Sequence, residues 1–290
     1  MDAALELKIK VINGSINSVE EGKLLLEKSR LFNELLTELE ESSLHLLHRL
    51  IQLSEIPFSQ EFTKVKEWRD QLAELTFCEA GFSLSGKSDD LLACYNAMIT
   101  SVLIRLDYPN YARIEKGIEW IVKYQNVSRH QTTAWKGKGI QKYGGCMKST
   151  PCFVGVVKSM IALSDYVHKI QSENESVREK LNDGLEYILA HKVFKRKSTA
   201  EPITKDITKL TFPFTYKTNI IEILRLLKNN NLMDDPRVDA AKEFLNGKKR
   251  GDSWRANPFY KPKFWVDFDP SRQKSEWITF EIGNILPNKG

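Results

Sequence analysis

The chain has 290 residues, of which 41% are hydrophobic, 28% charged and 10% aromatic. This composition is typical of a globular protein and excludes a collagenous, low-complexity or largely disordered chain. The net charge of +5 does not indicate a nucleic-acid partner, which would need the basic surplus concentrated on one face. We therefore expect no nucleic-acid partner, and an acidic partner or an anionic substrate fits slightly better.

The N-terminal residues show no basic leader followed by an apolar segment, so no signal peptide is expected. The most apolar helical stretch, residues 91–106, is interrupted by polar side chains and is shorter than the ~20 apolar residues that span a bilayer. The sequence therefore predicts no membrane span. Its four cysteines, without an export signal, are typical of reduced thiols and indicate a cytoplasmic location.

The first 42 residues are predicted to form an N-terminal arm and an amphipathic helix, separate from a domain over residues 43–290. Residues 6–12 alternate between polar and apolar side chains, which is typical of a short strand or an ordered arm. Residues 19–40 carry leucines at spacings near three, four and seven, which predicts one amphipathic helix. Ser18, with Glu21 three residues later, fits a capping box at its start.

An internal repeat is the most informative feature of the sequence. Residues 116–125 and 183–192 share an aliphatic residue, a glutamate, an aromatic residue and two aliphatic residues in the same order, and weaker copies lie at 239–245 and 64–68. Helical stretches that are apolar on most sides precede three of these copies, and a last one ends the chain: residues 89–106, 150–167, 218–227 and 275–286.

The repeat unit is therefore a helical hairpin. A helix that is apolar on most sides must be covered on most sides, so it belongs inside, and its striped partner belongs outside. Such hairpins form either an open α-solenoid or a closed α/α toroid. The unequal spacing of the copies favours the toroid, and the fold class we predict is all-α.

Several segments, taken in order along the chain, resemble the terpenoid cyclase and protein prenyltransferase superfamily. The similarity covers residues 76–286 and is closest to small proteins described as prenyltransferase and squalene oxidase repeat proteins. It implies helical hairpins in a full or partial α/α toroid around a central cavity. The segments that carry it are residues 81–92, 114–125, 144–158, 212–216, 265–267 and 276–279.

Asp89 and Asp90 open the predicted inner helix over residues 89–106, where cyclases of this superfamily hold an acidic motif that protonates an alkene. The resemblance implies that Asp89 is the catalytic acid and that Asp90 supports it. That role needs a carboxyl kept neutral by burial and by a second carboxylate. Lys87 replaces the first acid of the motif and would instead favour an ionised Asp89. The alternative is that Ser88 or Asp89 simply caps the helix.

Two cysteines, Cys146 and Cys152, raise the question of a metal site. Protein prenyltransferases hold zinc with Asp, Cys and His, and Asp267 is a candidate third ligand here. Zinc is thus a candidate cofactor, but a structural pair of semi-buried thiols is the favoured interpretation of these cysteines. His45 and His48 share one helix face and would need nearby carboxylates to bind a metal.

Aromatic residues lie near the starts of the predicted inner helices and could line one apolar cavity. Their π-faces would suit an isoprenoid chain or a carbocation, and the alternative is that they fill the core. The predicted substrate-binding residues are Tyr95, Phe153, Phe212, Phe214, Tyr216, Trp265, Trp277 and Phe280.

Two functions follow from these observations. The first is a terpenoid-cyclase-like isomerase or lyase, or a prenyltransferase-like protein, that handles an isoprenoid in a central aromatic cavity with Asp89 as the acid. The second is a non-catalytic helical-repeat module that binds a protein or lipid partner. Fold analogy favours the enzyme, whereas the incomplete acidic motif favours the binding module.

Overall fold

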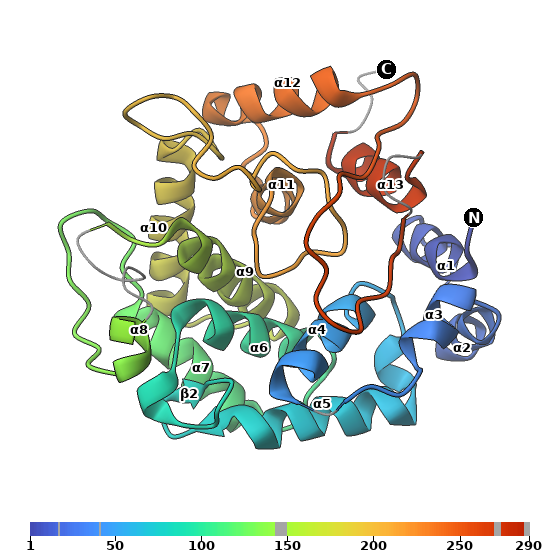
Figure 1. Ribbon diagram of the computed structural model, residues 1–290, viewed down its shortest axis with the longest axis horizontal. Coiled ribbons are helices and arrows are strands. Elements are labelled where there is room, and N and C mark those ends of the chain that lie inside the picture. Colours follow the sequence, from blue (N-terminus) through green and yellow to red (C-terminus); the bar gives the residue numbers. More distant parts are fainter. Residues whose placement is uncertain (17, 41, 143–149, 270–273, 287–290) are drawn as a thin grey trace.

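The protein is mostly α-helical, as predicted (Figure 1). The computed structural model describes all residues except 17, 41, 143–149, 270–273 and 287–290. Within these ranges the strands are a two-residue antiparallel pair, β1 (Phe77–Cys78) and β2 (Gly81–Phe82). No helix in the described part of the chain has both the length and the apolar character needed to cross a bilayer.

The N-terminal region differs from its prediction. Residues 6–12 belong to helix α1 (Ala3–Ile12) and form neither a strand nor an arm. The helix begins upstream of the alternating segment, where the Asp2 carboxylate accepts a hydrogen bond from the Ala4 amide. Its buried residues Ala4, Leu5 and Leu7 lie on one helical face, so tertiary packing overrides the alternating pattern.

The predicted helix over residues 19–40 is two helices, α2 (Val19–Glu27) and α3 (Arg30–Leu35). Ser29 ends the first and caps the second, because its hydroxyl accepts from the Phe32 amide and donates to Asp2 at 2.5 Å. The cap predicted at Ser18 is present, since its hydroxyl accepts from the Glu21 amide at 3.4 Å.

Helices occupy the segments of the predicted hairpins, and α7 packs on α6 and α10 on α9 (Figure 1). In this view α4, α6, α9, α11 and α13 lie nearer the middle of the molecule, with α5, α7, α10 and α12 at its periphery. The bounds are α4 Ser43–Leu53, α5 Thr63–Thr76, α6 Ala93–Arg105, α7 Tyr111–Tyr124, α9 Phe153–Lys169, α10 Glu175–Ala190, α11 Ile220–Asn229, α12 Asp239–Lys248 and α13 Glu276–Ile285.

Burial distinguishes the two kinds of helix as the sequence predicted. In α6, 11 of 13 residues are buried, whereas in its partner α7 only 5 of 14 are. The short elements are a helix, α8 (Lys138–Lys142), and three 3₁₀ turns, η1 (Ser59–Glu61), η2 (Ser88–Asp90) and η3 (Pro236–Val238).

A glycine at the same position of two repeat copies lets an outer helix approach its inner partner closely. A Cβ on Gly117 of α7 would overlap Thr100 Oγ1 of α6 and lie 3.2 Å from the Phe82 ring. A Cβ on Gly184 of α10 would overlap the Met160 side chain of α9. The shared glycine is therefore a packing requirement of the hairpin.

We expect Gly117→Ala to lower the free energy of unfolding by about 1–3 kcal/mol, because the added methyl group has no space against the stiff Thr100 side chain. Urea denaturation measures this change. Gly247→Ala on α12 is the matched control: a Cβ there meets nothing within 4 Å, so it should stabilise the chain by about 0.5–1 kcal/mol. Equal effects of the two substitutions would contradict the close approach.

Candidate functional site

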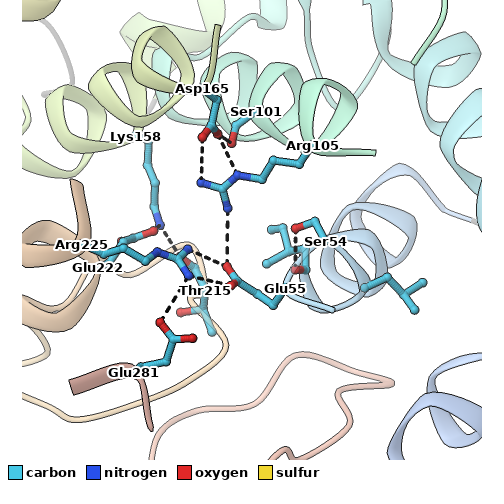
Figure 2. A network of polar contacts seen from close by, with 12 residues as sticks. Ser54, Glu55, Ser101, Arg105, Lys158, Asp165, Thr215, Glu222, Arg225 and Glu281 are labelled. Atoms are coloured by element: carbon cyan, nitrogen blue, oxygen red, sulfur yellow. Dashed lines mark hydrogen bonds and ion pairs between the residues drawn. The ribbon is translucent and has the colours of Figure 1, made fainter. Parts of the chain in front are cut away.

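Eight charged side chains meet at the centre of the molecule, and we call them the central charge network. Figure 2 labels all of them except Lys8. They come from α1, the connector after α4, and helices α6, α9, α11 and α13. Four are cations and four are anions, so their formal charges cancel. The members are Lys8, Glu55, Arg105, Lys158, Asp165, Glu222, Arg225 and Glu281.

Glu55 lies in the middle of this network. Its two carboxylate oxygens accept from both terminal nitrogens of Arg225, each at 2.6 Å. Lys8 approaches it at 3.3 Å and Arg105 at 3.5 Å. Burial alone would raise the pKa of Glu55, but the attraction of these three cations outweighs burial and holds its pKa well below the usual range.

Two further pairs extend the network along α9. Lys158 Nζ donates to Glu222 Oε1 at 2.5 Å and to the Thr215 carbonyl at 2.7 Å. Burial lowers the pKa of Lys158 although Glu222 opposes that shift. About two turns further on, Asp165 accepts from Arg105 Nε at 2.8 Å and thereby ties α9 to α6.

Lys8 connects the first helix to the last. Its ammonium lies 2.7 Å from Glu281 of α13 and 3.3 Å from Glu55. Arg225 also approaches Glu281, at 3.6 Å. Through Lys8, helix α1 is thus linked both to the connector after α4 and to α13.

Little open space remains at the centre. The cavity beside the network has a volume of about 30 Å³ and is lined by Glu55, Arg105, Lys158 and Glu222 together with apolar side chains. A site needs roughly 10–15 Å³ of such space to hold one water molecule. The centre therefore has room for a few water molecules but not for a substrate.

A larger pocket of about 360 Å³ lies where α4 and α6 begin, and we call it the end pocket. The connectors before α11 and α13 supply its other walls. The Tyr95 and Tyr216 rings stack there, with centroids 5.5 Å apart and planes at 26°. The lining residues are Leu44, His45, His48, Tyr95, Thr215, Tyr216, Lys217, Tyr260, Pro262 and Lys263.

Two other surface hollows are larger but have a different character. One, of about 490 Å³, lies against α7 and α10 and carries Glu115, Glu119 and Lys123. The other, of about 570 Å³, lies between residues 127–131 and α10 and is lined mostly by polar and charged side chains. Ligand sites are mainly apolar with a few placed polar groups, which the end pocket matches best.

The two histidines of α4 differ in environment. His45 Nδ1 lies 3.1 Å from the Glu40 carbonyl, and its ring packs edge-on against Phe264. His48 is only 8% exposed, and its Nδ1 has no hydrogen-bond partner among the described residues. Burial lowers the pKa of His48 to about 4, with a smaller contribution from His45. His48 is therefore neutral at pH 7.

The structure places the predicted acids on the surface. Asp89 and Asp90 lie in η2, before the first residue of α6, so neither caps that helix. The Asp89 side chain is 63% exposed and lies 3.3 Å from Lys138 Nζ. Asp90 accepts a hydrogen bond from the Ser85 hydroxyl at 2.7 Å. Neither residue lines the central cavity or the end pocket.

The predicted aromatic residues are dispersed. Tyr95 and Tyr216 meet in the end pocket, and Trp265 lies beside it, with its ring 6.5 Å from that of His48. Phe212 instead stacks on Trp277 at 5.6 Å within the core.

The other three lie elsewhere. Phe214 lines the central cavity, with the Arg225 guanidinium 4.4 Å from its ring centroid. Phe153 packs on Tyr187 of α10, and Phe280 packs half-buried against the core.

The predicted metal ligands are not brought together. Cys146 lies outside the described residues. Cys152 is half-buried at the start of α9, while Asp267 pairs with Lys261 at 2.5 Å. In the described ranges no three His, Cys, Asp or Glu side chains are placed to share a metal ion. Cys94 is the other thiol near Cys152, and burial raises its pKa to about 11.

Sequence reasoning missed the central charge network. A signal for it exists, because Lys158 and Asp165 stand inside a mostly apolar helix and Arg105 ends another. A charge in such a position must find a buried partner. Its partner cannot be read from the sequence, since Glu222 lies 64 positions beyond Lys158.

Comparison of the chain with family models, with curated proteins and with solved structures finds no match. The resemblance to terpenoid cyclases and prenyltransferases therefore remains a prediction that depends on the motifs alone.

We expect Glu55→Gln to lower the free energy of unfolding by about 3–5 kcal/mol, because it leaves buried cations without their counter-charge. Chemical denaturation measures this loss. Glu119→Gln is the matched control: Glu119 pairs with Lys116 on the surface of α7, so the midpoint should hardly move. A Glu55→Gln chain as stable as this control would show that the network does not hold the fold.

The lowered pKa of His48 predicts that the stability of the fold depends on pH. Its pKa is about 4 when folded and near 6.5 when unfolded, so between these values the unfolded chain binds more protons. Stability should therefore fall as the pH drops from 6.5 to 4, by about 3 kcal/mol from this residue. Unfolding of the wild type and of His48→Gln at several pH values isolates the contribution. Identical pH profiles would contradict a buried neutral imidazole.

Proposed function

We propose that the chain forms an α/α toroid and acts as a binding module that takes an apolar, isoprenoid-like ligand in the end pocket. The alternation of buried and peripheral helices supports the toroid (Figure 1). The contacts of Lys8 with Glu55 and Glu281 support its closure, because they link the first helix to both ends of the series of inner helices.

The observation that carries the proposal is the difference in space between the two candidate sites. The central cavity, of about 30 Å³, is bordered by paired charges, while the end pocket offers about 360 Å³. Pockets for small molecules usually measure about 300–1,000 Å³ and have mainly apolar walls. An apolar ligand therefore fits at the end of the inner helices rather than at their centre.

The aromatic side chains of the end pocket support an apolar ligand. Tyr95 and Tyr216 present stacked rings, and Tyr260 at the rim is 86% exposed. An exposed aromatic ring gains contact area and loses exposure to water when a ligand packs against it. The arrangement thus favours a ligand with an apolar body lying between the two connectors.

Binding without chemistry is favoured over acid-catalysed cyclisation. A proton donor for an alkene must be a carboxyl kept neutral by burial. Asp89 is exposed and pairs with Lys138, so it lacks the burial that this role requires. It also lies outside the lining of the end pocket.

Titration with N-phenyl-1-naphthylamine, a neutral apolar dye that fluoresces on leaving water, tests the proposal. We expect the wild type to bind it and Tyr95→Ala to bind about tenfold more weakly, since half of the stacked wall is lost. Tyr111→Ala, which removes an exposed tyrosine from α7, is the matched control and should leave the affinity unchanged.

Asp89→Asn provides a second comparison and should bind the dye like the wild type. Loss of binding in Asp89→Asn, or equal affinities of Tyr95→Ala and Tyr111→Ala, would contradict a ligand in the end pocket.

A further inference from the structure

We propose that the end pocket selects a ligand with a neutral polar head, a single hydroxyl or carbonyl oxygen on an apolar body, and that the imidazole of His48 binds this oxygen. The inference rests on the proposed function and specifies the class of its ligand. It follows from the polar groups of the pocket, which differ sharply in whether they already have partners.

His48 is the polar group in need of a partner. It lines the pocket, is 8% exposed, and leaves its Nδ1 unpaired among the described residues. The indole nitrogen of Trp265, whose ring lies 6.5 Å away, is also buried and unpaired in the described part of the chain. Buried polar atoms normally have partners, so two orphans beside one pocket indicate a site for a polar atom of a ligand.

His45, the other histidine of the pocket, already has a hydrogen-bond partner. His45 Nδ1 already lies within hydrogen-bond distance of the Glu40 carbonyl, at 3.1 Å. The two histidines are one helical turn apart and line the same pocket. His45 is therefore a natural control for His48.

The cations of the pocket are already neutralised. Lys217 Nζ lies 2.7 Å from Asp206, and Lys263 Nζ lies 2.7 Å from Glu40. A phosphate or diphosphate head would have to displace these carboxylates and would meet their repulsion. An ammonium head would find no unpaired carboxylate among the lining residues. A neutral oxygen avoids both costs and satisfies His48.

The test is displacement of bound N-phenyl-1-naphthylamine by three ligands that share a decyl chain: 1-decanol, decyl phosphate and decylamine. In the wild type, 1-decanol should displace the dye at concentrations at least about tenfold lower than the other two. His48→Leu should weaken binding of 1-decanol about tenfold more than it weakens binding of the dye. His48→Gln, which keeps a hydrogen-bonding group, should retain most of the preference for 1-decanol. His45→Leu should change the affinities for 1-decanol and for the dye by the same factor.

Several results would overturn the assignment. If decyl phosphate or decylamine displaced the dye as effectively as 1-decanol does, the pocket would accept a charged head. Equal effects of His48→Leu and His45→Leu on 1-decanol would remove the role of His48. Failure of the wild type to bind the dye at all would instead overturn the proposed function together with this inference, so the two failures are distinguishable.

Discussion

Buried charge is the constraint on which the arrangement of the helices depends. Glu55 is surrounded by Arg225, Arg105 and Lys8, which arrive from three separate helices (Figure 2). A buried ion pair adds little stability compared with well-packed apolar side chains, but a buried charge without its partner is strongly destabilising. Each inner helix must therefore sit where its own charge meets a counter-charge. Displacing one of these helices would separate its charge from the counter-charge, a cost that adds to the loss of apolar packing.

The same constraint determines where a ligand can bind. The network leaves a central cavity of only about 30 Å³, whereas the end pocket, where the inner helices begin, offers about 360 Å³. Thr215 connects the central charge network to the end pocket. Its carbonyl accepts a hydrogen bond from Lys158, and the residue also lines the end pocket. Moving this wall would deprive a buried ammonium of an acceptor. The wall beside Tyr216 is therefore held in place before a ligand arrives, which reduces the entropy lost on binding.

The sequence contained enough information for the hairpins but not for the site. The repeat predicts inner and outer helices because apolar periodicity is a local property, and the close approach at Gly117 explains one of its shared residues. The break at Ser29 was missed because the leucine spacing runs through it. Of the predicted aromatic residues, Tyr95 and Tyr216 do meet, while Phe153 packs outward on α10. Spacing places a residue near a helix start, but the packing of neighbouring helices decides which side it faces.

This division of roles has a consequence for specificity. The charged residues of the network hold the inner helices together, so a substitution among them alters the fold before it alters ligand binding. The connectors before α11 and α13 supply most of the end pocket, including Tyr216, Tyr260 and Lys263. Among the pocket residues of these connectors, Thr215 contacts the network, through its backbone carbonyl. Any residue at this position would provide that carbonyl. The size and polarity of the pocket can therefore change through these loops while the charges that hold the helices stay as they are.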